Sequence, residues 1–165
     1  MPNTYIPEVR DFIGRFVKGS ARKNIQRDAI LVDAFGDSPE MADHLLALVL
    51  SGTKTATCTS LWALEHDNEA PPVPGTLEVI LDGSKKPRCI IKTVQVQQVA
   101  YEDVTAEFAR AEGEHEPHDL SDEHVLQHWR DGHWAFFTRT LIPIGYVPTQ
   151  DMPLIFEHFK VIYIE

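Results

Sequence analysis

Apolar residues recur at the spacing of an α-helix near the start of the chain. Five of them fall at relative positions i, i+3, i+4, i+7 and i+8, namely Val9, Phe12, Ile13, Phe16 and Val17. Residues with this spacing share one face of a helix, so the pattern predicts an amphipathic helix over residues 7–18. We expect this helix to extend the domain, either packing on it or forming a contact in a homodimer.

A second helix is predicted within DSPEMADHLLALVLSG, residues 37–52. Asp37 or Ser38 can accept hydrogen bonds from its first N–H groups, and Pro39 suits the first turn. Gly52 can end the helix in a left-handed conformation. The polar segment that follows therefore stands at a junction between a helix and the next element.

Beyond Gly52 the pattern changes to that of strands. Residues in each predicted strand are rich in Thr or alternate between apolar and polar types, in TATCTSLW (55–62), TLEVILDG (76–83), RCIIKTVQVQQV (88–99) and FEHFKVIYI (156–164). A short helix around Phe108 and a longer one from near Ser121 separate the last two. This order predicts an α+β fold with a mainly antiparallel sheet or small barrel.

Composition narrows the class of ligand. The 165 residues fit one domain, and they carry a net charge of −10. Binding to duplex nucleic acid depends on neutralising many phosphates with Lys and Arg, so tight binding to duplex DNA is not expected. A single nucleotide or nucleoside in a locally basic pocket remains compatible with this charge.

Two further observations predict a cytoplasmic protein. The longest apolar run, residues 45–50, is too short to cross a membrane, and the N-terminus lacks the basic and apolar regions of a secretory signal. Cys58 and Cys89 are the only cysteines, and both are expected to be reduced, buried thiols.

The segment GTKTAT, residues 52–57, contains the first candidate site. A hydroxyl nucleophile such as Thr57 needs a base, and Lys54 can serve once its surroundings favour the neutral amine. Residues three apart face opposite sides of a regular strand, so the two converge only if the backbone turns between them. The alternative is a solvated polar turn.

Acidic and histidine-rich sequence fills the region from 112 to 133. Glu112, Glu114 and Glu116 form an acidic cluster in which one carboxylate can transfer a proton, or which is simply an exposed loop. The histidines are His115, His118, His124, His128 and His133. His124 and His128 have the i, i+4 spacing of zinc ligands, but HVLQH lacks the glutamate of the HExxH motif, so no metal is predicted.

Large aromatic residues follow on the same predicted helix. Trp129, Trp134, Phe136 and Phe137 can stack on a nucleobase, although aromatics at helical spacing more often fill a core. We expect most of them to be packing residues, with one ring lining a pocket.

Read together, several segments resemble the ASCH domain family. They are FGDSPEMADHLLALVLSGTKTATCTSLW, PGTLEVILDG, VTAEFARAEGE, HWRDGHWAFF and DMPLIFEHFKVIY, and they run from about residue 35 to 163. The sequence is most similar to the bacterial stand-alone branch with a GxKTAT signature. This resemblance implies a PUA-like small antiparallel β-barrel surrounded by helices over residues 35–165, with residues 1–34 as an N-terminal helical extension.

The resemblance also implies an activity. Some small bacterial ASCH proteins are amidohydrolases that deacylate N4-acetylcytidine, using a Lys, a Thr three residues later and a Glu in the following helical segment. By motif these fall on Lys54 as the base, Thr57 as the nucleophile and Glu112 as the proton donor, with no metal or other cofactor. Backbone N–H groups of residues 52–54 are expected to stabilise the oxyanion.

Other positions are predicted to contact the substrate. The amidohydrolase motif has an arginine five residues after the lysine, where this chain has Thr59, so Arg88 or Arg130 can supply that contact. The full set of predicted substrate-binding residues is Thr53, Thr55, Thr59, Arg88, Trp129 and Arg130. The alternatives to a nucleoside amidohydrolase are a ribonuclease that cleaves single-stranded RNA with the same lysine, and a module that binds RNA or a modified base without turnover.

Overall fold

The computed structural model describes residues 5–19, 24–115 and 120–165. Its centre is one five-stranded sheet, in the order β1-β3-β4-β5-β2. The strands are β1 (Leu31–Asp33), β2 (Ala56–Ser60), β3 (Leu77–Leu81), β4 (Pro87–Ala100) and β5 (Pro153–Ile164). All neighbours are antiparallel except β1 and β3, which are parallel.

The two long strands give the sheet its curvature. The register between β4 and β5 shifts at Ile90/Ile91 and again at Thr93/Gln95. Irregularities of this kind bend a strand and increase its twist. The result is a curled half-barrel of mixed strand direction, an α+β fold of the PUA-like type.

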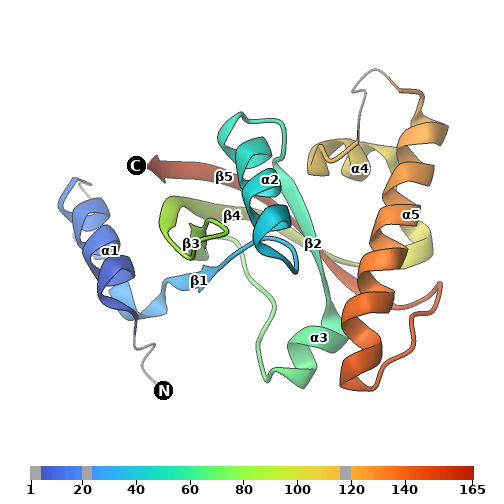
Figure 1. Ribbon diagram of the computed structural model, residues 1–165, viewed down its shortest axis with the longest axis horizontal. Helices are drawn as coiled ribbons and strands as arrows, with labels where there is room; N and C mark the ends of the chain where they lie inside the picture. The colour runs from blue at the N-terminus through green and yellow to red at the C-terminus, as the bar shows by residue number, and fades with distance from the viewer. Residues whose placement is uncertain (1–4, 20–23, 116–119) are drawn as a thin grey trace.

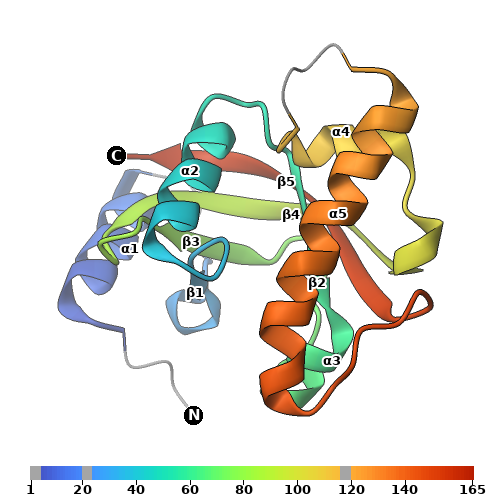
Figure 2. The same ribbon diagram turned by 45° about the vertical axis from the view of Figure 1, so that its right-hand side comes forward.

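Helices lie at both ends of this sheet and over one of its faces (Figures 1 and 2). They are α1 (Pro7–Gly19), α2 (Pro39–Leu50), α3 (Leu61–His66), α4 (Ala106–Glu112) and α5 (Asp122–Leu141). Three short 3₁₀ turns, η1 (Arg27–Ala29), η2 (Tyr101–Asp103) and η3 (Ile142–Ile144), join other elements. In both views α1 lies at one end of the sheet and α4 and α5 lie at the other.

The predicted N-terminal helix is present as α1. Its apolar face is buried, with Phe12 and Phe16 against the ring of Tyr163 and in one core cluster with Val79 and Ile90. This helix therefore packs on the sheet of its own chain. The strand β1, which also falls before residue 35, pairs with β3 in the same sheet.

A second core cluster holds α4 and α5 against the sheet. Phe108 of α4 stacks on Phe156 of β5 with ring centroids 3.8 Å apart, and Trp129 and Phe137 of α5 are buried beside them. Most of the aromatic set on α5 is thus packing, as the sequence predicted. Among the described residues, no helix is long and apolar enough to cross a membrane.

One local prediction was partly wrong, and one strand was not predicted. The segment 55–62 was expected to be a strand or the approach to one, but β2 ends at Ser60 and α3 begins at Leu61. The Ser60 hydroxyl accepts a hydrogen bond from the Ala63 N–H at 3.4 Å, which starts the helix as an N-cap. The three-residue strand β1 was not predicted, because so short a segment has no readable alternation.

Candidate functional site

The turn between α2 and β2 directs Lys54 inward. Gly52 has a left-handed φ of 81° and ends α2. Its N–H donates to the Val49 carbonyl at 3.1 Å, while the N–H groups of Thr53 and Lys54 both donate to the Leu48 carbonyl at 3.0 Å. This is the Schellman arrangement that closes a helix. The expected oxyanion site in residues 52–54 is therefore wrong, because these N–H groups already have acceptors.

The same turn is held against the end of α4. The Thr55 N–H donates to the Ala111 carbonyl at 2.8 Å. Gly113, which ends α4 with a φ of 67°, lies so close to this turn that a Cβ there would be 2.4 Å from the Thr53 carbonyl oxygen. Only glycine fits this contact, so the turn carrying Lys54 and the helix end carrying Glu112 have a fixed relative position.

Lys54 is a buried cation. Its side chain is 1% exposed, and its Nζ lies 3.4 Å from Glu112 Oε1 and 3.9 Å from Glu114 Oε1. The Nζ also lies 5.6 Å from the centre of the Phe35 ring. Two carboxylates and an aromatic face all stabilise an ammonium ion, which explains how the charge is accommodated away from water.

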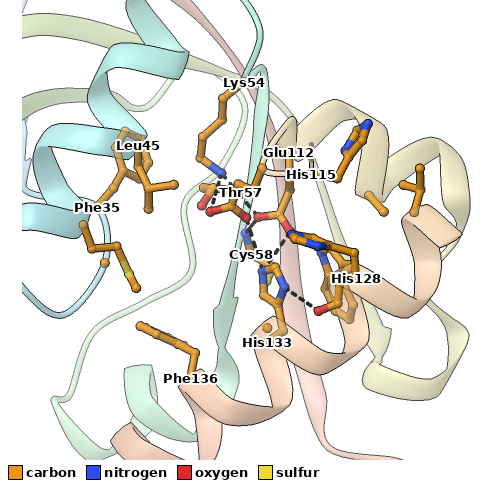
Figure 3. Close-up of a pocket in the computed structure, with 17 residues that line it drawn as sticks. Phe35, Leu45, Lys54, Thr57, Cys58, Glu112, His115, His128, His133 and Phe136 are labelled. Atoms are coloured by element: carbon orange, nitrogen blue, oxygen red, sulfur yellow. Dashed lines mark hydrogen bonds and ion pairs between the residues drawn. The ribbon is translucent and has the colours of Figure 1, made fainter. Parts of the chain in front are cut away.

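Glu112 is the centre of the buried polar network (Figure 3). Its Oε1 accepts from Lys54 and from the Cys58 N–H at 3.1 Å, and its Oε2 accepts from Trp129 Nε1 and lies 3.0 Å from His133 Nε2. Burial alone would raise the pKa of Glu112. The cations of His133 and Lys54 outweigh it and hold the pKa at about 2, so Glu112 is a permanent carboxylate.

His133 supplies a second cation, whose side chain is 15% exposed. Its Nδ1 lies 2.9 Å from the Trp129 carbonyl oxygen, which fixes a proton on that nitrogen, and Nε2 faces Glu112. Burial opposes a charged imidazole, but the pKa of His133 is raised well above its usual value by Glu112 and by Cys58. The ring also stacks on Trp129 at a centroid distance of 4.1 Å, so its orientation is fixed on both sides.

Glu114 is the outermost member of the group. Its side chain is 25% exposed, and its oxygens lie 3.9 Å from Lys54 Nζ and 3.7 Å from His133 Nε2. Burial raises the pKa of Glu114, and the opposing effect of Lys54 does not cancel this. The pKa values of Glu112 and Glu114 are therefore shifted in opposite directions although the two residues are only two positions apart.

These groups lie in the wall of a cavity of about 190 Å³, here called the Lys54 cavity. Thr57 and Cys58 of β2 and the rings of Phe35 and Phe136 also line it. In Figure 3, Lys54 and His133 approach Glu112 from opposite sides, while Phe35 and Leu45 form a facing apolar wall. The structure thus brings Lys54, Thr57, Glu112 and Trp129 together around one cavity.

A second cavity of about 240 Å³ adjoins the first, here called the Glu78 cavity. The two share Phe35, Thr57 and Phe136 in their walls. The second is lined by three carboxylates, Asp33, Glu78 and Glu157, and by no Lys or Arg of the described residues. Burial, with Glu157 and Asp33 nearby, raises the pKa of Glu78 to about 8.

The other predicted substrate-binding residues lie outside the Lys54 cavity. Thr53 bonds to Ser51, and the exposed Thr55 hydroxyl donates to Ala111. Thr59 lines the Glu78 cavity. The remaining two are arginines: Arg88 is exposed and pairs with Asp82 at 3.3 Å, and Arg130 accepts a bond from Tyr101 through its carbonyl.

The histidines divide between the cavity and the surface. His115, His128 and His133 line the Lys54 cavity, whereas His124 is exposed and bonds to Ser121. His118 lies outside the described residues. The predicted pair His124 and His128 does not share a site.

A different group of residues has metal-ligand geometry. The ligand atoms of Cys58, Glu112 and His133 lie within 4.8 Å of one another. Burial, followed by the Glu112 carboxylate, raises the pKa of the Cys58 thiol to about 11. A metal would have to displace protons from both the thiol and His133 Nε2, so the present hydrogen bonds fit an ion-paired network better than a metal centre.

From the sequence, His133 was considered only as a possible metal ligand, and Glu114 only as part of an acidic cluster. Neither was predicted to contact Lys54 or Glu112. Trp129 and His133 are four residues apart, so they share one face of α5, and this spacing is the signal that could have joined them. The proximity of Glu114 to Lys54 depends on the left-handed turn at Gly113. Gly113 is the local signal for that turn, but it does not show that Lys54 lies beside it.

The chain matches a known family over most of its length. The sequence profile of the ASCH domain matches residues 31–163. The chain belongs to the ASCH domain family. A solved DUF984 protein from Enterococcus faecalis V583 is 33% identical to this ASCH domain, with a TM-score of 0.83 over 95% of this chain and 89% of that one.

A second solved structure carries the family name itself. It is an ASCH domain from Lactobacillus crispatus JV V101, 27% identical, with a TM-score of 0.82 over 98% of both chains. No curated protein matched the sequence. The similarity to both solved structures extends over the N-terminal helix as well as the sheet, because each covers nearly the whole chain.

Proposed function

We propose that this ASCH domain is an amidohydrolase that removes the acyl group from an N4-acylcytidine-like nucleoside. The observation that carries the proposal is the position of Lys54. Its buried Nζ, 3.4 Å from Glu112, faces the cavity that Thr57 also lines. A hydroxyl and an amine in one enclosed wall are the groups that nucleophilic acyl transfer requires.

The reaction proceeds in two halves. The Lys54 ammonium first passes a proton to a carboxylate of the cavity. The resulting amine takes the Thr57 proton as the Thr57 oxygen bonds to the amide carbonyl, whose π electrons move to its oxygen. The Lys54 ammonium formed in this step stabilises the oxyanion. The C–N bond then breaks as the carboxylic acid returns its proton to the leaving amine, and water hydrolyses the acyl-Thr57 ester in the same way.

Glu112 is assigned a positioning role in this scheme. The four donors around its oxygens and its pKa of about 2 support this role in place of the proton transfer that family resemblance implies. A carboxylate that stays ionised orients Lys54 and His133 and balances their charge.

The walls of the two cavities favour a nucleoside over a polymer. Phe35 and Phe136 offer ring faces to a base. Of the adjoining acids, Asp33 and Glu157 would repel a phosphodiester, and all three, with Glu78, can form hydrogen bonds with sugar hydroxyls. The net charge of −10 acts in the same direction.

Membership of the ASCH family supports an alternative, the binding or cleavage of single-stranded RNA. Cleavage would depend on the same Lys54, and simple binding would weaken steeply with salt. The two alternatives are distinguished by offering RNA and free nucleoside to the same preparation.

The test is incubation of the purified protein with N4-acetylcytidine and detection of cytidine. We expect turnover by the wild type, and a loss of at least about 100-fold in Thr57→Ala. The matched control is Thr149→Ala, at an exposed position that lines neither cavity, and it should keep wild-type turnover. No turnover together with Lys54-dependent RNA cleavage would replace the amidohydrolase with the ribonuclease.

A further inference from the structure

Two carboxylates flank Lys54, and they differ in what they touch. Glu112 is 2% exposed and accepts from donors at both oxygens. Glu114 is 25% exposed, and within the described ranges no group donates a hydrogen bond to it. Its nearest cations lie beyond hydrogen-bond distance, at 3.9 Å for Lys54 and 3.7 Å for His133.

A group that transfers a proton must be able to hold it and must reach the substrate. Glu112 fails the first requirement, since protonation would break bonds to Lys54, Cys58 or His133. Glu114 meets both, because its oxygens are not engaged and it lines the Lys54 cavity. Its exposed fraction leaves it accessible to a molecule bound there.

We propose that Glu114 is the catalytic residue that protonates the leaving amine, and that Glu112 only positions its neighbours. The inference rests on the amide hydrolysis proposed above. It assigns the two carboxylates on either side of Gly113 to different tasks.

The proton is accounted for at each step. The Lys54 ammonium first gives a proton to the Glu114 carboxylate, leaving an amine and a carboxylic acid with the same total charge. The amine takes the Thr57 proton during attack. The acid gives its proton to the substrate nitrogen as the C–N bond breaks, which restores the ammonium and the carboxylate. In deacylation water replaces Thr57 as the attacking group, and Glu114 protonates the departing Thr57 oxygen.

The electrostatic surroundings are consistent with this exchange. The charged or titratable groups that act on Glu114 are Lys54 before β2, Glu112 on α4, His133 on α5 and His44 on α2. Burial and the Glu112 charge raise the pKa of Glu114, whereas the three basic groups lower it. The net rise brings the acid form closer to neutral pH than an ordinary glutamate allows.

The experiment compares an amide with an ester in Glu114→Gln, Glu112→Gln and the control Glu107→Gln. The substrates are N4-acetylcytidine and 4-nitrophenyl acetate, whose phenolate leaves without a proton. Because both substrates form the same acetyl-Thr57, the comparison uses the rate of acylation, measured in single-turnover experiments. Glu114→Gln should slow acylation by the amide at least about 100-fold and lower the amide-to-ester ratio of acylation rates at least about tenfold. Glu112→Gln should slow both substrates by similar factors, and Glu107→Gln, on the exposed side of α4, neither.

Each outcome decides the assignment. An active wild type in which Glu114→Gln leaves acylation by the amide unchanged, or slows acylation by both substrates equally, overturns the role of Glu114 and leaves the amidohydrolase standing. An inactive wild type overturns both. Carbon-13 NMR of the wild-type carboxyl groups provides a check that does not depend on folding of the variants: Glu114 must titrate above the usual glutamate range, and an ordinary or lower value overturns the proposal.

Discussion

The two adjoining cavities shift the pKa of a carboxyl group in their walls in opposite directions. In the Lys54 cavity, Glu112 is more deeply buried than Glu78 is in its own, yet it keeps its charge because Lys54 and His133 are within 3.4 Å. In the Glu78 cavity no described cation lies in the wall, and the pKa of Glu78 is raised to about 8. The presence of counter-charges, more than depth, decides whether a carboxylate here is ionised.

The largest effect should follow from removing the buried cation. Lys54→Met keeps the apolar stem but removes the base, so we expect a fall in kcat for N4-acetylcytidine of about 10³-fold. Steady-state kinetics measure it, beside the exposed control Lys160→Met on β5. Retention of wild-type kcat in Lys54→Met would contradict the role of Lys54 as the base. It would also contradict the functional difference between the two cavities.

Neutralising one carboxylate in each cavity should give unequal losses of stability. Glu112→Gln leaves two buried cations without their partner and should lower the free energy of unfolding by about 3–5 kcal/mol. Glu78→Gln removes an acid that has no counter-charge and should be neutral or stabilising at pH 7. Urea unfolding of both variants measures this, and equal losses would show that the two cavities do not differ.

The pH dependence of stability should have opposite signs for the two groups. The pKa of Glu112 is lowered from 4.5 to about 2, so its stabilisation is complete above pH 4.5 and is lost as the pH falls toward 2. The pKa of Glu78 is raised from 4.5 to about 8, so it favours the folded state below pH 4.5, and stability declines as the pH rises to 8.

Comparison of the wild type with Glu78→Gln separates that decline from the one due to His133, which has the same sign above pH 6.5. We expect the difference in unfolding free energy between the two proteins to change by roughly 1–3 kcal/mol between pH 4.5 and 8. A constant difference across this range would contradict the raised pKa.

The smallest effect should come from an ion pair in solvent. Arg139 of α5 bonds to Asp37, before α2, at 2.7 Å, but nearly half of the arginine side chain is exposed. Arg139→Ala should therefore cost less than about 1 kcal/mol in urea unfolding. If Arg139→Ala lowered the free energy of unfolding as much as Glu112→Gln, the loss would depend on the ion pair itself and not on its burial.

The sequence predicted elements that have a local cause. The stripe on α1, the Ser38 cap of α2 and the Ser121 cap of α5 were readable because spacing and hydrogen bonds within a few residues determine them. The break between β2 and α3 was not, because Thr-rich sequence favours a strand while Ser60 starts a helix. Such competition is decided by packing.

The sequence predicted several of the residues that belong to the site, but it did not predict how they contact one another. Lys54 and Glu112 are 58 residues apart, and resemblance to a family paired them. That Glu112 is occupied by Trp129, His133 and Cys58 depends on how α4 and α5 pack against β2. The division of roles between Glu112 and Glu114 could not be read from the sequence for the same reason.

The contact between Gly113 and the Thr53 carbonyl also bears on how a ligand can enter and leave. Since a single Cβ would not fit there, the turn before β2 and the end of α4 move as one piece. The opposite wall is formed by side chains, Phe35 before α2 and Phe136 on α5. We therefore expect a ligand to enter and leave past these two rings, while the contact at Gly113 keeps Lys54 and Glu112 in place.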